Sequence, residues 1–423
     1  MTSKSLADWL AWIERQHPKS IELGLDRVRE VAQRMGLKRP AKKVITIGGT
    51  NGKGSTVAFI EAIARAAGWR VGAYTSPHLL TYNERVRIAG IDTDDGDLVA
   101  GFGAVEAARL DTPLTYFEYG TLCALWLFQR SKLDLAVLEV GLGGRLDAVN
   151  LIDADVAVIT TVDIDHQDWL GNDRETIGFE KAGIARAWKP LVLGEDDPPS
   201  SVLGHAYAIG ASAIRANCDF FFEVVDGDHW RWREVGYVLE LPLPQLAAPA
   251  QVRNAATAIA ALRALGQPMP RASYQQGIAE TQVAGRLQRF ERDGVEVVVD
   301  VAHNPQAACE LAAWLQQAPA AGRTFAVFAA LGDKDVVGVV AALTTHIDGW
   351  FLAGIDDAGP RGLAVTAFAQ RLVGTAAADG GQYATVPEAL AAACVQAGAG
   401  DRVLVFGSFH TVAAAMRSLR ASD

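Results

Sequence analysis

The chain of 423 residues has few cysteines and no close pair of them. They are scattered at Cys123, Cys218, Cys309 and Cys394. Structural zinc sites and disulfide frameworks depend on short, regular cysteine spacings, so neither is indicated. This distribution predicts a reduced, cytoplasmic setting.

The sequence also lacks a long hydrophobic run and an excess of positive charge. No apolar segment approaches the length that spans a bilayer, and we interpret the N-terminal MTSKSLADWLAWIERQHP as a soluble amphipathic helix. With 39 Lys and Arg against 49 Asp and Glu, the net charge of -10 argues against nucleic-acid or membrane partners. An anionic ligand must therefore meet a local positive site.

What the sequence does contain is an alternation of short Val, Ile and Leu runs with alanine-rich segments of helical period. This alternation is typical of parallel sheets joined by crossover helices. Strands are expected at residues 44–47, 71–75, 135–140, 156–162 and 191–193, and helices at 53–67, 97–109, 116–130 and 174–186.

The pattern changes near residue 220. Residues 220–241 have the alternating, aromatic pattern of a small antiparallel patch, and the proline-rich LPLPQLAAPAQ reads as a connector. A helix is expected at 251–265, and a second strand and helix series starts at Val295. Its further strands are expected at 325–331, 350–353 and 403–406. The length and this pattern predict two α/β units with a boundary near residues 284–288.

A glycine-rich turn, VITIGGTNGKGSTVAFI, lies where the first expected strand meets a helix. A helix N-terminus offers unpaired N–H groups, and glycines let phosphate oxygens approach them. Lys53 adds a full charge, and the hydroxyl of Ser55 or Thr56 can reach a phosphate-bound magnesium ion. The spacing departs from GxxxxGK[ST], because Ile47 replaces the first glycine and Gly54 separates Lys53 from Ser55. A phosphate site is indicated, and a plain strand-to-helix turn is the alternative.

Potential metal ligands follow two neighbouring strands. Glu139 ends the strand in DLAVLEVGLGGRLD, and Asp163, Asp165, His166 and Asp168 follow the strand in VAVITTVDIDHQDWLG. Ligands of open α/β sheets bind at the carboxyl ends of strands, and a buried carboxylate must be paired, hydrated or metal-bound. We expect these groups beside the phosphates. The alternatives are a helix-capping or salt-bridge acid for Glu139 and a hydrogen-bonded loop histidine for His166.

In order and spacing, several segments resemble the folylpolyglutamate synthases and dihydrofolate synthases of the Mur ligase superfamily. The segments are LGLDRV, GGTNGKGS, TSPHLLTYNERVRI, TYFEYGTLCAL, EVGLGGRLDAVN, DIDHQDWLG, FEKAGI, AGRLQ and DVAHNP. The resemblance covers nearly the whole chain. It implies a P-loop ATPase-like domain at residues 1–284, with a mainly parallel sheet and a small antiparallel patch, and a smaller Rossmann-like α/β domain at residues 285–423.

The resemblance implies an ADP-forming amide ligase. In such enzymes ATP phosphorylates a carboxylate, and the amine of L-glutamate displaces phosphate from the acyl phosphate. The carboxylate substrates would be 7,8-dihydropteroate, giving dihydrofolate, and tetrahydrofolate polyglutamates; the residues leave open whether one or both are used. We also expect two magnesium ions and a monomer.

The resemblance implies site residues position by position. The ATP contacts are Gly52, Lys53, Gly54, Ser55, Asn254, Arg286 and Asp300, and the magnesium ligands are Ser76, Glu139 and His166. The pterin-binding region comprises Leu25, Asp26, Arg27, Thr115, Tyr116, Phe117, Glu118 and Leu146, while His303 faces the glutamate side. The catalytic group comprises Lys53, His166, Lys181 and Arg286.

Lys181, in FEKAGI, matches a lysine that is carbamylated to N6-carboxylysine in the family. That change converts a cation into an anion able to organise magnesium. The alternative is an ordinary solvated lysine on a helix face.

Three other functions are weaker. In LGDKD, Asp335 directly follows Lys334, so the N-K-x-D spacing of a GTP-dependent switch fails. A ligase for cell-wall precursors would need a nucleotide-sugar domain larger than the segment ahead of the phosphate loop. A silent binding protein would have lost magnesium ligands, and none is missing.

The sequence departs from the family pattern at Val149, which stands where the family commonly has threonine.

Overall fold

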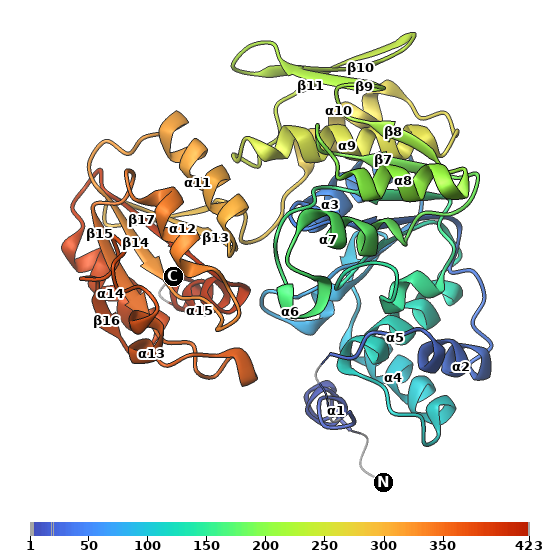
Figure 1. The fold of residues 1–423 in the computed structure, drawn as a ribbon, viewed down its shortest axis with the longest axis horizontal. Coiled ribbons are helices and arrows are strands. Elements are labelled where there is room, and N and C mark those ends of the chain that lie inside the picture. The colour runs from blue at the N-terminus through green and yellow to red at the C-terminus, as the bar shows by residue number, and fades with distance from the viewer. Residues whose placement is uncertain (1–3, 18, 20, 422–423) are drawn as a thin grey trace. The chain divides into compact units, whose positions relative to one another are not determined.

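The computed structural model describes residues 4–17, 19 and 21–421. The chain divides into two compact units (Figure 1). Unit 1 comprises residues 1–245 and 251–281, and unit 2 comprises residues 246–250 and 282–423. Each is an α/β unit with a mainly parallel sheet, which confirms the predicted fold class.

Unit 1 is built on an eight-stranded sheet in the order β4-β3-β2-β5-β1-β6-β7-β8. Its strands are β1 (Ala41–Gly48), β2 (Val71–Tyr74), β3 (Val86–Ile88), β4 (Ile91–Asp92), β5 (Leu133–Glu139), β6 (Val156–Ile159), β7 (Pro190–Leu193) and β8 (Ser212–Arg215). Residues 44–47 of β1 and 135–138 of β5 are all buried. Such continuous apolar strands are typical of a parallel sheet with helices on both faces.

The helices of unit 1 connect and cover these strands. They are α1 (Leu6–Ile13), α2 (Asp26–Arg34), α3 (Lys53–Ala66), α4 (Asp95–Arg109), α5 (Tyr116–Arg130), α6 (Gln167–Leu170), α7 (Arg174–Ala182), α8 (Ser200–Ile209), α9 (Ala250–Ala264) and α10 (Arg271–Glu280), with 3-10 turns η1 (Tyr82–Arg85) and η2 (Ala148–Leu151). The predicted amphipathic helix is α1, which buries Leu6, Trp9 and Ile13.

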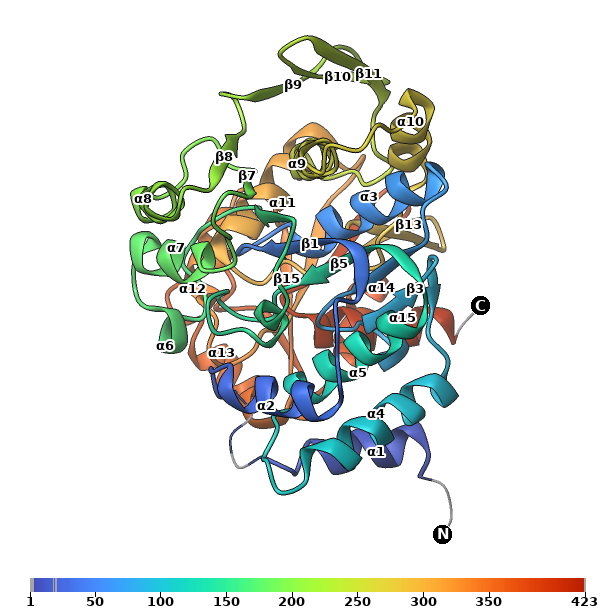
Figure 2. The same ribbon diagram turned by 90° about the vertical axis from the view of Figure 1, so that its right-hand side faces the viewer.

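The aromatic segment after β8 forms the predicted antiparallel patch. Strands β9 (Phe220–Val224), β10 (His229–Glu234) and β11 (Tyr237–Pro242) pair in the order β11-β10-β9, at one end of unit 1 in Figure 2. Trp230 and Trp232 are fully buried, whereas Arg231 between them pairs with Glu223 and Glu240. This alternation follows from the two-residue period of a strand. Trp232 Nε1 donates to Ala256 O of α9 at 3.1 Å, which fixes the patch on unit 1.

Unit 2 has a six-stranded sheet in the order β12-β13-β17-β14-β15-β16, with β12 antiparallel to β13. Its strands are β12 (Gln288–Arg292), β13 (Val295–Asp300), β14 (Thr324–Phe328), β15 (Gly349–Ala353), β16 (Gly381–Tyr383) and β17 (Arg402–Phe406). Its helices are α11 (Pro305–Gln317), α12 (Val336–Leu343), α13 (Val365–Gln370), α14 (Val386–Gln396) and α15 (Phe409–Arg420), with a 3-10 turn η3 (Gly359–Arg361). Phe328 stacks on Phe406 at 4.8 Å between ring centres within the core.

Three expected elements end three or four residues earlier than predicted. The strand expected at 156–162 ends at Ile159. Thr160 N still donates to Gly48 O at the end of β1, but the side chains of Thr160 and Thr161 bond to Asn51 in the loop that follows β1. The strand expected at 325–331 ends at Phe328. The helix expected at 174–186 ends at Ala182, because the Gly183 carbonyl accepts from Asn150 Nδ2 rather than continuing the helix.

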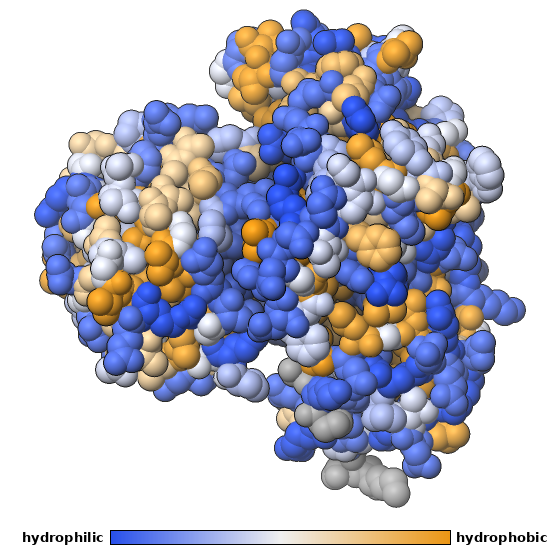
Figure 3. Space-filling view, viewed as in Figure 1, coloured by the Kyte–Doolittle hydropathy of each residue, from blue (hydrophilic) through white to orange (hydrophobic). Residues whose placement is uncertain are grey.

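The surface shown in Figure 3 mixes polar and apolar side chains over both units. Within the described ranges, no helix combines the length and apolar character needed to cross a membrane. The large exposed apolar side chains include Val235 and Trp188, which lie in separate segments.

Candidate active site

The loop between β1 and α3 takes a conformation that depends on glycine. Gly49 has φ of +144° and Gly52 of +85°, a region that other residues rarely adopt. A Cβ on Gly52 would overlap Oδ1 of Asn254, so this predicted ATP contact from α9 lies directly against the loop. Lys53 Nζ donates to the carbonyls of Gly49 and Thr50 at 3.0 and 3.1 Å. The loop therefore gathers a cation and a helix N-terminus at one place.

Two threonines at the end of β6 hold this loop, and sequence reasoning missed them. Thr161 O accepts from Thr50 N at 2.8 Å, and Thr161 Oγ1 accepts from Asn51 N at 3.1 Å. Thr160 Oγ1 donates to Asn51 O at 2.6 Å. The polar pair directly after the apolar strand VAVI was the available signal. These bonds fix the conformation of the loop.

The predicted metal ligands Ser76 and Glu139 meet at the carboxyl edge of the sheet. Glu139 ends β5 and is buried, and its Oε2 accepts from Ser76 N at 3.1 Å. A Cβ on Gly54 would lie 3.8 Å from the same oxygen, which places the first turn of α3 beside the carboxylate. Carboxylate and hydroxyl oxygens are the ligands that Mg²⁺ prefers, so these residues fit that ion.

His166 lies in the loop after β6, as the first residue before α6, with φ of +54°. Its backbone N–H donates to Asp165 Oδ1 at 2.8 Å, and its Nε2 lies 3.8 Å from Asp165 Oδ2. Over the described chain, no group of three His, Cys, Asp or Glu side chains is arranged to hold a metal ion. A metal site that uses Glu139 and His166 must therefore be completed by other oxygens, such as a hydroxyl and phosphates.

Lys181 is buried on α7, so the alternative of a solvated helix lysine is wrong. Burial, together with the charge of Lys53, lowers the pKa of Lys181 to about 7, against the opposing effects of Asp165 and Glu195. Sequence reasoning missed Glu195, which follows β7. Burial raises the pKa of Glu195 to about 7, although Arg174 Nη2 lies 3.0 Å from its Oε2. A much larger share of the Lys181 amine is therefore neutral at pH 7 than of an ordinary lysine.

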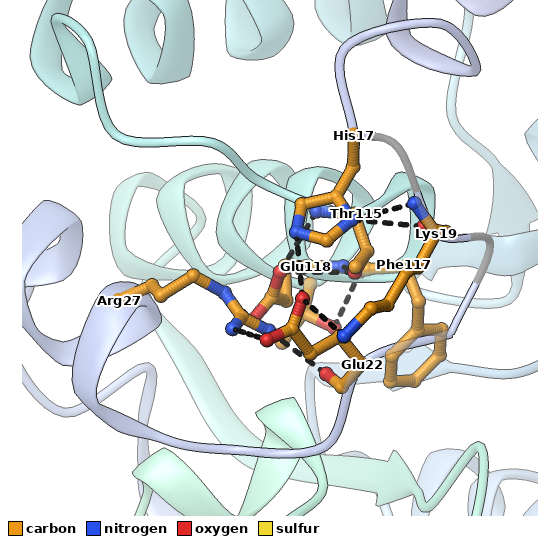
Figure 4. Close-up of polar contacts among 8 residues, drawn as sticks. His17, Lys19, Glu22, Arg27, Thr115, Phe117 and Glu118 are labelled. Carbon is orange, nitrogen blue, oxygen red and sulfur yellow. Dashed lines mark hydrogen bonds and ion pairs between the residues drawn. The ribbon is translucent and has the colours of Figure 1, made fainter.

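Arg27 and Glu118, two residues of the predicted pterin-binding region, are joined directly (Figure 4). Arg27 Nη2 donates to Glu118 Oε1 at 3.0 Å and to Glu22 O at 2.8 Å. Glu118 Oε2 accepts from both N and Oγ1 of Thr115, which caps α5. Glu22, which sequence reasoning missed, also lies 3.0 Å from His17 Nε2. This network fixes the segment before α2 on the start of α5.

The remaining residues of that region lie around the same helix start. Gly24 N donates to Leu146 O at 3.3 Å, which joins the LGLDRV and EVGLGGRLDAVN segments. The ring of Phe117 lies 5.9 Å from that of Tyr74, and Tyr116 lies 5.8 Å edge-on from Tyr82. Leu25 is buried as the N-cap of α2, whereas Asp26 has a fully exposed side chain. The structure thus gathers these predicted residues, except the side chain of Asp26.

Asp147, next to the predicted Leu146, is a buried acid that sequence reasoning did not single out. It accepts backbone N–H bonds from Gly141, Leu142 and Val149 at 2.9–3.0 Å. Burial raises the pKa of Asp147 to about 7 in spite of these bonds. Its position after two glycines in GLGGRLD was the available signal. The acid shapes the loop that follows Glu139.

In unit 2, Arg286, Asp300 and His303 lie at the carboxyl end of β13. Asp300 accepts from Leu287 N at 2.9 Å and from Ala302 N at 2.8 Å. Burial raises the pKa of Asp300, and the charge of Arg286 opposes this. His303 Nδ1 lies 2.9 Å from Val301 O, so this nitrogen carries the proton. The sequence analysis gave Arg286 and Asp300 as ATP contacts and His303 as a residue on the glutamate side, and unit 2 brings all three to one strand end.

Comparisons with known proteins agree with this geometry. The Mur ligase middle domain matches residues 47–262, and the Mur ligase glutamate ligase domain matches residues 285–409. The dihydrofolate synthase/folylpolyglutamate synthase of Escherichia coli is 46% identical over 417 residues, which cover 98% of this chain and 96% of that protein. The chain belongs to the dihydrofolate synthase/folylpolyglutamate synthase family of Mur ligases.

Two solved structures of this family resemble the chain over its full length. E. coli FolC in complex with DHPP and ADP matches with a TM-score of 0.93 and 45% identity, covering 99% of each chain. A bifunctional folylpolyglutamate synthase/dihydrofolate synthase with Mn, AMPPNP and L-glutamate bound matches with a TM-score of 0.91 and 44% identity, covering 99% of this chain and 98% of that one. Both structures hold a nucleotide, and the second also holds a divalent metal and glutamate.

Proposed function

We propose that this chain is an ATP-dependent ligase that joins L-glutamate to 7,8-dihydropteroate and to reduced folates, releasing ADP and phosphate. The observation that carries the proposal is the convergence of a phosphate loop, a buried strand-end carboxylate and a buried low-pKa lysine in unit 1. Family relatives of nearly full length support the substrates, because their structures hold a nucleotide and glutamate. An acyl phosphate is the intermediate that this reaction requires.

In the proposed site, the N–H groups of Gly52, Gly54 and Ser55 bind nucleotide phosphates at the start of α3. Lys53 neutralises the transferring phosphoryl group, since phosphoryl transfer depends mainly on alignment and charge neutralisation. Asn254 lies close enough to the loop to bond the same nucleotide.

Ser76, Glu139 and His166 would hold the magnesium ions. Their hydroxyl, carboxylate and imidazole donors fit a divalent cation that is completed by phosphate oxygens. When bound, the ions supply charge neutralisation at the phosphates. That relatives bind Mn supports a divalent metal, and the presence of two ions stays a prediction.

For Lys181 we propose the N6-carboxylysine form. The cationic amine first loses one proton, and the neutral amine then attacks carbon dioxide, forms an N–C bond and releases a second proton, which leaves a carbamate anion. A pKa near 7 favours this reaction, because an ordinary lysine is almost wholly protonated at neutral pH. The neighbouring charge of Lys53 also favours an anion at this position.

In unit 2, Arg286 and Asp300 are proposed ATP contacts and His303 a glutamate contact. Arg286 is the proposed catalytic cation of this unit, and Asp300 orders the loop through two backbone N–H bonds. The pterin would bind near Thr115, Tyr116, Phe117 and Glu118, with Leu25, Asp26, Arg27 and Leu146 around them. The proposed domain limits are residues 1–284 and 285–423. The monomeric state and cytoplasmic location stay predictions.

The test is ADP release measured with glutamate and either dihydropteroate or tetrahydrofolate as the carboxylate substrate. We expect release that depends on both the pterin and glutamate. Release with neither pterin, but with another carboxylic acid and an amino acid, would instead identify a different Mur-type amino-acid ligase. Release without any carboxylic acid would contradict a ligase.

A further inference from the structure

Two arginines of the described chain are buried, and only one of them is paired with a carboxylate. Arg402 in unit 2 lies 2.6 Å from Glu296 Oε2. Arg85 in unit 1 is 8% exposed, and the described residues place no carboxylate within ion-pair distance of it; its partners are an imidazole and aromatic rings. A buried charge without a counter-charge is costly, so the surroundings of Arg85 suit the binding of an anionic group.

The groups around Arg85 orient its guanidinium without neutralising it. Nε donates to His78 Nδ1 at 2.8 Å. The guanidinium carbon lies 5.2 Å from the ring centre of Tyr82 and 5.5 Å from that of Tyr116. Aromatic faces attract a cation but cannot replace a full negative charge.

The outer nitrogens of Arg85 remain available to a ligand. Neither Nη1 nor Nη2 bonds to another described residue, and neither is among the polar atoms that are buried without a partner. Both therefore keep access to solvent, although most of the side chain is covered. Two adjacent guanidinium nitrogens form the fork that binds a carboxylate through two parallel hydrogen bonds.

Arg85 also joins two parts of the proposed site. His78 is two residues beyond Ser76, whose N–H bonds to Glu139 Oε2. Tyr116 belongs to the segment proposed to bind the pterin, at the start of α5. An anion on Arg85 would therefore lie between the proposed metal ligands and the proposed pterin site.

We infer that Arg85 binds the carboxylate of the pterin substrate and sets the specificity for an acid at that end of the molecule. The inference rests on the proposed function. L-Glutamate and ATP also carry negative charge, but their proposed contacts lie at His303 and at the phosphate loop. The pterin carboxylate is the charge that a ligand held beside Tyr116 would bring to Arg85.

The test compares the binding of dihydropteroate with that of its primary carboxamide, which lacks the charge but keeps the size. We expect the wild-type chain to bind the acid about tenfold to a hundredfold more tightly than the amide. Arg85→Met should bind both ligands about equally, while its affinity for ADP is unchanged. Arg85→Lys, which keeps the charge but loses the fork, should retain only part of the preference.

Arg87→Met is the matched control, because Arg87 lies two residues further along, in β3, and pairs with Glu61 at 2.8 Å. It should keep the full preference for the acid. If Arg85→Met is too unstable to measure, the preference of Arg85→Lys for the acid over the amide tests the inference. A full preference in a folded Arg85 variant, or an effect confined to the KM of glutamate, would overturn the inference alone. A wild-type chain that binds neither pterin would overturn the proposed function as well.

Discussion

In both units the candidate residues follow the carboxyl end of a parallel strand, but their charges are balanced by different means. In unit 1, Lys53 and Lys181 are close enough that the charge of one lowers the pKa of the other. In unit 2, the buried Asp300 is satisfied by two backbone N–H groups and by Arg286. Two cations therefore lie near each other in unit 1, an arrangement suited to bound anions such as nucleotide phosphates, whereas the buried acid of unit 2 already has its partners within that unit.

This difference predicts that substitutions in unit 1 mainly change activity or metal use, and that Asp300 in unit 2 mainly contributes stability.

The largest effect is expected for Lys53→Ala. It removes the cation at the phosphate loop, so kcat should fall about a hundredfold or more while the fold is kept. Turnover of glutamate and dihydropteroate is the measurement. Lys42→Ala, an exposed lysine paired with Asp134, is the control and should be neutral. Equal turnover in a folded Lys53→Ala would refute the nucleotide site.

Lys181→Ala should lower kcat about tenfold or more, because it removes the proposed carbamate. Added acetate should restore part of this loss by supplying a carboxylate in the same space. The wild-type chain should also lose activity in degassed, low-pH buffer and regain it with bicarbonate. Lys189→Ala, at a half-exposed lysine, should show neither effect. A crystal structure of the active enzyme with a bare Lys181 amine would contradict the carbamate.

Glu139→Gln should raise the magnesium concentration for half-maximal activity about tenfold, because an amide oxygen binds a hard cation less well than a carboxylate. The replacement keeps an acceptor for the Ser76 N–H, so the fold should be retained. Glu61→Gln is the control, because it also removes a buried carboxylate, which pairs with Arg87. It tests whether the loss of a buried carboxylate elsewhere in unit 1 raises the magnesium requirement. The same magnesium dependence in Glu139→Gln and the parent would exclude Glu139 as a ligand.

The smallest effect is expected for Asp300→Asn, measured as the free energy of unfolding against pH. At low pH the variant should be less stable by about 1–2 kcal/mol, because one of two backbone N–H groups loses its acceptor. The raised pKa of Asp300 means that its protonated form stabilises the fold at low pH. That contribution is lost as pH rises through the raised pKa of Asp300. The difference in the free energy of unfolding between wild type and variant should therefore narrow as pH rises. A gap that widens with pH would contradict this account of unit 2.

The sequence predicted the parts of the fold that depend on local pattern. The strand before the phosphate loop, the helix at 116–130 and the aromatic patch after residue 220 were all found, because periodicity and turn residues act within short segments. The strand expected to reach residue 162 was too long, because its last residues bond to a loop more than a hundred residues away. A single sequence does not display such distant partners.

In the candidate site, too, local sequence pattern predicted some features, while others depend on residues that are distant in the sequence. Glu139 and Lys53 were found from position alone, at a strand end and in a glycine-rich turn. The low pKa of Lys181 depends on burial and on the charge of Lys53, which belongs to a different helix. Likewise, Arg85 looks like an ordinary arginine of a polar turn in the sequence, and its lack of a carboxylate partner emerges only when its neighbours are known.

The central claim is that ATP activates a pterin carboxylate before glutamate attacks it. The most direct test uses dihydropteroate whose carboxylate carries a heavy oxygen isotope, incubated with ATP, magnesium and glutamate. An acyl phosphate leaves one labelled oxygen on the released phosphate, so we predict labelled phosphate in a one-to-one ratio with the dihydrofolate formed. Formation of dihydrofolate with wholly unlabelled phosphate would contradict the account.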